Sequence, residues 1–144
     1  MSSQPTVPPG APEREQPESF RARSLSASLT VDDLQESLAW YRDVADFTVE
    51  RKHEENGELR AVVLIAGSVR LVLTQDDGAK GWDREKGEGF SLHFTTVQDI
   101  DEIARRIERR GGTLDSPPGD TDWGGRALRV TDPDGFTLTI ASVG

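Results

Sequence analysis

The chain has 144 residues, no cysteine, and a formal net charge of −9 from 17 Lys and Arg against 26 Asp and Glu. This length suffices for one core of ordinary size, and the lack of cysteine excludes disulfides, thiol nucleophiles and thiolate metal sites. The acidity argues against a nucleic-acid surface, which needs clustered Lys and Arg, and is compatible with cationic partners.

The N-terminal segment differs in composition from the rest of the chain. Five of the eight prolines fall in the first twenty residues, among Ser, Gln and Glu. This predicts a disordered tail over residues 1–20 and a single domain over 21–144. Because neither a secretory signal nor a run of about 20 apolar residues occurs, we expect a cytoplasmic protein without membrane contacts.

The first half of the domain predicts the element order β-α-β-β-β. Residues 24–31 alternate polar and apolar, as a strand with one buried face does. Asp32 or Asp33 is placed to cap a helix. The apolar positions that recur at helical spacing in it are Leu34, Leu38, Tyr41 and Ala45. The extended segments that follow are 47–50, 59–66 and 69–74, with turns at Asn56-Gly57 and Gly67-Ser68.

The second half repeats this order. Residues 90–97 are predicted to be extended, and a helix starts near Asp99 and ends at Gly111-Gly112. The last three predicted strands run from Thr113 to Pro117-Pro118, over 126–131, and over 136–142 after the turn at 132–135. The repeat defines module one at about 21–75, a connecting segment at 76–89 and module two at about 90–144.

Two tandem βαβββ modules predict an α+β fold. Each module would form a curved mixed sheet with its helix on the outside. The other strand faces would then surround a concave cavity, which is where a ligand would be expected.

Five phrases spread along the chain carry a family resemblance. They are SLTVDDL at 28–34, SLAWYRDV at 37–44, DID at 99–101, WGGR at 123–126 and DPDG at 132–135. Together they resemble the glyoxalase, bleomycin-resistance and extradiol-dioxygenase superfamily, also called vicinal oxygen chelate proteins. The resemblance implies this fold and a homodimer, but not one function, because the superfamily hosts isomerases, dioxygenases, thiol transferases and drug-binding proteins. Asp46 departs from the glycine common there, although Asp tolerates left-handed geometry.

The resemblance also implies where a metal would be held, since metal-dependent members place ligands on the first and last strands of both modules. The corresponding residues here are Ser26, Val72, Leu92 and Thr139. None is a good ligand for a divalent ion. A single bulge would bring His93 into the place of Leu92, and the residues leave both alignments open. We therefore expect no metal, cofactor or catalytic residue, with His93 the one candidate ligand.

The candidate ligand-binding residues follow from the proposed strand faces and from the resemblance. Trp123 offers a flat ring to a planar ligand, and Arg70 and Arg126 would favour an anionic or carbonyl-bearing one. Trp123 could equally belong to the core, and both arginines to exposed sheet. The remaining candidates are Ser26, Ser28, Leu92, Phe94 and Thr139.

The leading hypothesis is a metal-independent protein that binds a planar or amphipathic small molecule, similar to the drug-sequestering members and so connected with antibiotic resistance. The alternative is a glyoxalase- or dioxygenase-like lyase or isomerase with a non-standard or metal-free site. A third interpretation is an accessory protein with a vestigial cavity.

Overall fold

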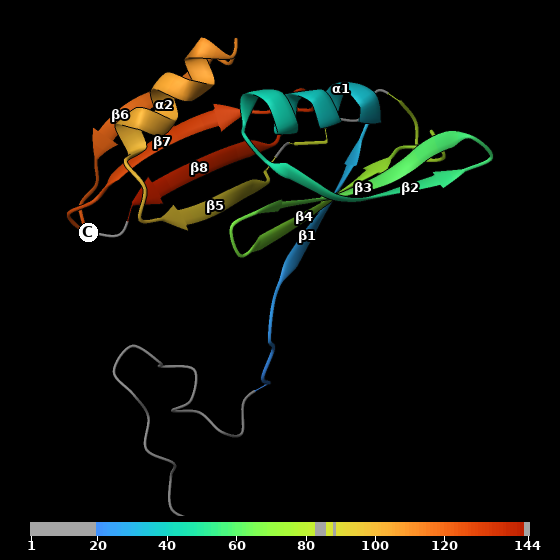
Figure 1. Ribbon diagram of the computed structural model, residues 1–144, viewed down its shortest axis with the longest axis horizontal. Coiled ribbons are helices and arrows are strands. Elements are labelled where there is room, and N and C mark those ends of the chain that lie inside the picture. The colour runs from blue at the N-terminus through green and yellow to red at the C-terminus, as the bar shows by residue number, and fades with distance from the viewer. Residues whose placement is uncertain (1–19, 83–85, 88, 143–144) are drawn as a thin grey trace, which may run out of the picture.

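The computed structural model describes residues 20–82, 86–87 and 89–142, and it has the predicted α+β architecture of two repeated modules (Figure 1). The predicted tail therefore lies outside the described residues, apart from Phe20. Module one contains β1 Ser26–Val31, α1 Leu34–Ala39, the π-helical turn η2 Trp40–Val44, β2 Thr48–Glu55, β3 Glu58–Ala66 and β4 Val69–Gln75. Module two contains β5 Ser91–Thr96, α2 Ile100–Arg109, β6 Leu114–Asp120, β7 Arg126–Thr131 and β8 Thr137–Ser142.

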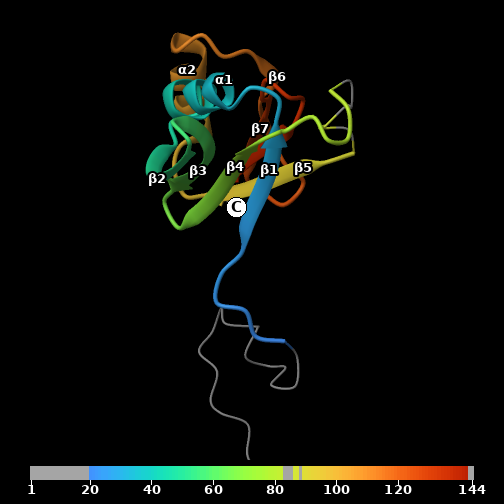
Figure 2. The same ribbon diagram turned by 90° about the vertical axis from the view of Figure 1, so that its right-hand side faces the viewer.

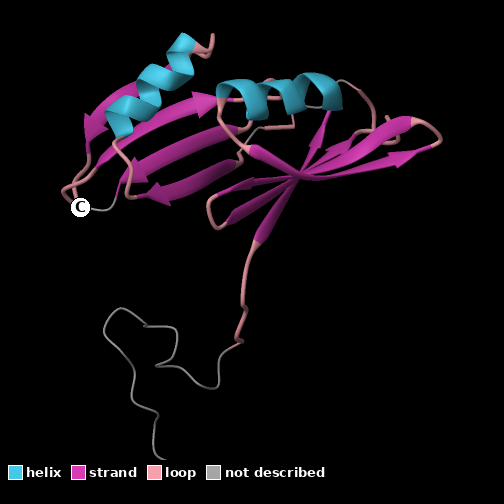
Figure 3. Ribbon diagram, in the orientation of Figure 1, coloured by secondary structure: helices cyan, strands magenta, loops and turns pink. Residues whose placement is uncertain are grey.

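Each module folds into its own four-stranded mixed sheet. The strand orders are β1-β4-β3-β2 and β5-β8-β7-β6, in which the first pair is parallel and the other two pairs are antiparallel. Helix α1 packs against β3 and β4, and α2 packs against β6, β7 and β8. Both helices lie on the same side of the molecule (Figures 2 and 3). Each sheet therefore has one helix-covered face and one helix-free face, which we call its open face.

The hydrophobic core is one continuous cluster that joins the modules beneath the helices. Strand alternation supplies it, because residues such as Leu29 and Val31 are buried while their neighbours are exposed. Phe47 of module one meets Phe94 of module two edge to face, with ring centroids 5.9 Å apart. No helix in the described part of the chain is long and apolar enough to cross a membrane.

The helix boundaries follow the predicted capping chemistry. The side chain of Asp33 accepts a hydrogen bond from Glu36 N, and that of Asp99 accepts one from Asp101 N. At the end of α2, Gly111 has φ 92°, which a glycine adopts without steric cost. After η2, Asp46 takes the left-handed conformation at φ 70°, which Asp tolerates better than most residues.

Two predicted strand ends differ from the observed ones by two residues or more. Strand β6 continues through Pro117 and Pro118 to Asp120, whereas the sequence predicted its end at the prolines. This is possible because β6 is an edge strand whose pairing with β7 is irregular, so the missing N–H groups interrupt no inner ladder. Strand β2 runs on to Glu55 and leaves His53 exposed near the Asn56-Gly57 turn.

The turn before β8 fixes the two modules to each other. Tyr41 of η2 donates a 2.6 Å hydrogen bond to the buried carboxylate of Asp132. The neighbouring Asp134 accepts from Asp32 N and from the Ser37 hydroxyl. We call this set of contacts the turn lock.

Lys86 and Gly87 of the connecting segment lie at the same turn. Gly87 lies so close that a Cβ built on it would be 2.0 Å from the carbonyl oxygen of Gly135. Beside it, the Lys86 ammonium lies 2.6 Å from Asp32 and 2.7 Å from Asp76. Lys86, Asp76 and the turn lock therefore form one polar junction.

Candidate functional site

The open face of sheet two carries a row of three polar side chains on three adjacent strands. The strand register pairs His93 of β5 with Thr139 of β8, and Thr139 with Arg129 of β7. These residues line a hollow of about 300 Å³, which we call the open-face pocket. Its other lining residues are Gly87, Gly89, Phe90, Ser91 and Thr137. Adjacent strands lie about 4.8 Å apart, so His93 and Arg129 can approach one ligand bound over Thr139.

The structure distinguishes between the two alignments that the sequence left open. His93 shares the open face with Thr139, whereas Leu92 and Phe94 lie on the helix-covered face and pack against the core. The reason is the distance from the end of each strand to the next helix cap. Strand β1 ends at Val31, two residues before the cap Asp33, but β5 ends at Thr96, three residues before the cap Asp99. The extra residue shifts the alternation of β5 by one position relative to β1.

Arg129 has no ion-pair or hydrogen-bond partner among the described residues. The two arginines proposed from the sequence do have partners: Arg70 contacts Glu50, and Arg126 contacts Asp101 and Asp120. Hydrogen bonding to Arg70 lowers the pKa of Glu50, as expected for a compensated pair. Among the described residues that line the open-face pocket, Arg129 therefore supplies a guanidinium without a partner.

Sequence reasoning missed Arg129, although the signal was present. The buried neighbours Leu128 and Val130 alternate with it, so strand periodicity alone puts Arg129 on the opposite face. The same face carries Asp115, whose carboxylate accepts a hydrogen bond from the Thr131 hydroxyl.

The candidate residues of module one lie on a different surface. Ser26 and Ser28 are on exposed positions of β1, where they pair with Arg70 and Val72 of β4. Neither serine lines the open-face pocket. Trp123 is 63% exposed in the loop between β6 and β7 and also lies outside that pocket. Trp82 is 57% exposed and lies against Gly78.

The donor set does not fit the divalent metal that the family resemblance implies. The corresponding positions supply a hydroxyl from Ser26, the aliphatic Val72, one imidazole from His93, and a second hydroxyl from Thr139. Across residues 20–82, 86–87 and 89–142, no group of three or more His, Asp or Glu side chains is arranged to hold a metal ion. A stable site wants three or four converging imidazole or carboxylate ligands.

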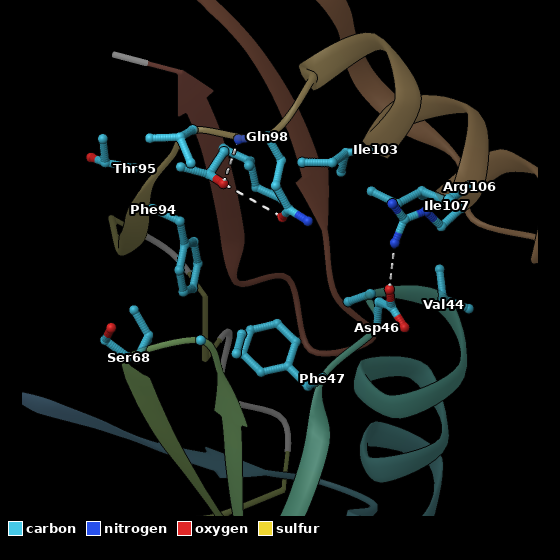
Figure 4. Close-up of a pocket in the computed structure, with 17 residues that line it drawn as sticks. Val44, Asp46, Phe47, Ser68, Phe94, Thr95, Gln98, Ile103, Arg106 and Ile107 are labelled. Atoms are coloured by element: carbon cyan, nitrogen blue, oxygen red, sulfur yellow. Dashed lines mark hydrogen bonds and ion pairs between the residues drawn. The ribbon is translucent and has the colours of Figure 1, made fainter.

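A second and larger hollow lies between the modules (Figure 4). This inter-module pocket has a volume of about 640 Å³. Its floor is built by Phe47 and Phe94, and α2 contributes Ile103 and Ile107 to one wall. The Gly67-Ser68 turn of module one forms part of the opposite wall.

Charge in the inter-module pocket is concentrated at Asp46. Its carboxylate lies 2.8 Å from a guanidinium nitrogen of Arg106 and 2.9 Å from one of Arg110. Hydrogen bonding to Arg110 and Arg106 holds the pKa of Asp46 below its ordinary value. Asp46, the left-handed residue that follows η2, thus links this part of module one to α2 and its C-terminal end.

Curated sequences similar to this chain include lactoylglutathione lyases. The protein GLX1 of Arabidopsis thaliana is 25% identical over 136 residues, which are 90% of this chain and 47% of that protein. The chain thus spans about half the length of this plant relative. A probable lactoylglutathione lyase of Vibrio cholerae is 29% identical over 125 residues, covering 82% of this chain and 88% of that protein.

Solved structures share the fold. TioX from Micromonospora sp. ML1 matches with a TM-score of 0.70 at 19% identity, covering 84% of this chain and 98% of its own. TnmS3, an antibiotic binding protein from Streptomyces sp. CB03234, matches with a TM-score of 0.68 at 20% identity, covering 88% and 100%. A superfamily member from Sphaerobacter thermophilus matches with a TM-score of 0.66 at 27% identity, covering 85% and 98%.

The family model agrees with the structural likeness. The model described as Glyoxalase/Bleomycin resistance protein/Dioxygenase superfamily matches residues 23–140, which include every strand from β1 to β7 and most of β8. The chain therefore belongs to the glyoxalase, bleomycin resistance protein and dioxygenase superfamily.

Proposed function

We propose that this chain is a metal-independent small-molecule-binding protein whose ligand lies in the open-face pocket. The observation that carries the proposal is the row of His93, Thr139 and Arg129 across one hollow, with Arg129 unpartnered among the described residues. An unpaired guanidinium next to an imidazole and hydroxyl groups suits recognition of an oxygen-bearing ligand. The description of the structural neighbour TnmS3 as an antibiotic binding protein is compatible with this role.

The chemistry of the pocket favours a planar ligand with an anionic or carbonyl oxygen. Arg129 offers a forked pair of N–H donors, while Ser91, Thr137 and Thr139 offer hydroxyl groups. Phe90 lines the pocket and packs edge to face on Phe136, with ring centroids 5.4 Å apart. Its ring supplies flat apolar contact area.

The test is calorimetric titration with 2-naphthoate and with its uncharged methyl ester. We expect the acid to bind better than the ester, and Arg129→Gln to weaken binding of the acid by about tenfold, as loss of one charge-assisted hydrogen bond predicts. Arg51→Gln is the matched control, because Arg51 is an exposed arginine of β2 outside the pocket. Equal binding to Arg129→Gln and the unmodified protein would remove the open-face pocket as the site.

The competing function is a lyase, and the named sequence relatives favour it. Protein purified without chelator or affinity metal is subjected to elemental analysis and assayed for lactoylglutathione lyase activity with and without added divalent metals. We expect no stoichiometric metal and no activity. A bound transition metal that is lost in His93→Ala would contradict metal independence.

The assembly and location are part of the same proposal. We propose a cytoplasmic homodimer, on the strength of the family resemblance, with sequestration of a toxic compound as its role. Light scattering of the purified full chain measures its mass. Expression in a sensitive host, with Arg129→Gln as the comparison, measures protection against candidate compounds.

A further inference from the structure

We propose that the inter-module pocket is a second binding site, separate from the open-face pocket, for an uncharged and largely apolar small molecule. The two pockets share no lining residue. They also differ in chemistry, because one carries a guanidinium without a partner in the described chain and the other is lined mainly by apolar side chains. A compound that fits one should therefore be a poor ligand for the other.

The first argument is the shape and composition of the walls. Module one contributes the segments 44–47 and 66–69, and module two contributes residues from β5, β8 and α2. Figure 4 shows the rings of Phe47 and Phe94 on one side of the space, and Ile103 beyond it. A volume of about 640 Å³ falls within the roughly 300–1,000 Å³ typical of small-molecule pockets, and two aromatic rings offer flat contacts.

The second argument is charge. The two charged lining residues, Asp46 and Arg106, already bind each other, with 2.8 Å between oxygen and nitrogen. An ionic ligand would have to compete with that pair, whereas an uncharged ligand leaves it intact. Gln98 lines the pocket with an amide whose oxygen faces the Thr96 hydroxyl, and Figure 4 shows its nitrogen toward the space. One carbonyl acceptor on the ligand would match that amide nitrogen.

The position of the pocket gives binding a structural consequence. A ligand there touches both modules at once and lies beside the Asp46 ion pairs that join η2 to α2. A bound ligand should therefore stabilise the contact between the two modules and raise the melting temperature of the chain.

The experiment uses Nile red, an uncharged dye whose fluorescence rises in apolar surroundings, titrated into the full-length chain. We expect one saturable site per chain. Ile103→Trp fills the pocket from the α2 side and Ser68→Trp fills it from the opposite turn, so each should weaken binding at least tenfold. Two blocking variants on opposite walls keep the test valid if one fails to fold, which circular dichroism checks.

Two control variants separate this site from other surfaces. Leu25→Ser removes a side chain that is 88% exposed outside the pocket, and should leave dye binding unchanged. Arg129→Gln should also leave it unchanged, so failure of the open-face site and failure of this one are distinguishable. Unaltered dye binding in both tryptophan variants would overturn the proposal. A change in oligomeric mass in those variants, without a change in dye binding, would instead identify the pocket as an interface between copies.

Discussion

The bond between Tyr41 and Asp132 gives the sharpest prediction for stability. Tyr41→Phe removes only the hydroxyl that donates to Asp132 at 2.6 Å, and it keeps the ring contacts with Trp40 and Phe47. A hydrogen bond to a charged group contributes about 1.5–3 kcal/mol. Asp132 retains the backbone donors of Asp134 and Phe136, so its carboxylate is not left bare. We expect the free energy of unfolding at pH 7 to fall by about 2 kcal/mol.

The pH dependence of that loss follows from the pKa of Asp132. Burial raises this pKa above its ordinary value, while the Tyr41 hydrogen bond lowers it. A carboxyl group with a raised folded pKa loses stabilising free energy as the pH rises from its unfolded to its folded pKa. Tyr41→Phe raises the folded pKa further, so the deficit should be larger at pH 7 than below the unfolded pKa of 3.8.

Urea unfolding of both proteins at pH 7 and at acid pH measures the two deficits. Thr48→Val is the matched control, because it removes an exposed hydroxyl and should change the free energy of unfolding by less than about 0.5 kcal/mol. A double-mutant cycle with Asp132→Asn isolates the pair. A deficit below about 0.5 kcal/mol at pH 7, or one equal at both pH values, would refute the assigned role of the bond.

Three further predictions concern backbone and charge. Asp46→Ala should be less stable than Asp46→Gly by about 1 kcal/mol in urea unfolding. Both variants lose the arginine contacts, but only alanine is strained by the left-handed backbone at φ 70°. Equal stability of the two variants would show that this strain is absent. Gly87→Ala should lower the free energy of unfolding by about 1–3 kcal/mol, because its Cβ would meet the Gly135 carbonyl. Gly119→Ala is the control, since a Cβ there meets nothing closer than 3.9 Å. Similar losses of stability in both variants would argue against the close approach of Gly87 to Gly135. Since Arg110 and Arg106 lower the pKa of Asp46, the contribution of that carboxylate should be lost as the pH falls through its folded pKa, opposite in direction to Asp132; acid unfolding of Asp46→Asn should lack this component.

The fold was largely predictable because its signals are local. Capping by Asp33 and Asp99 and the turn at Asn56-Gly57 depend on a few neighbouring residues. The end of β6 was predicted wrongly because proline tolerance depends on whether a strand is at an edge, which is a property of the whole sheet.

The candidate site was less predictable because it depends on strand faces and on partners distant in sequence. One extra residue before α2 decides that His93, and not Leu92, shares a face with Thr139. The sequence made Arg126 a candidate for ligand binding, but in the structure Asp101 and Asp120 bind it. Only the structure reveals that Arg129 has no such partner among the described residues. The turn before β8 identifies that strand in the sequence. Thr139 could therefore be matched without a structure to the position where the family resemblance implies the last metal ligand.

The turn lock also bears on how the two halves of the chain depend on each other. Its contacts join residues about a hundred positions apart, and none of them requires the peptide bonds of the connecting segment. A chain cleaved once between Asp77 and Lys80 should accordingly stay assembled under native conditions. The halves, expressed as separate polypeptides, would then be expected to reconstitute the junction, with Tyr41→Phe in one half weakening their association.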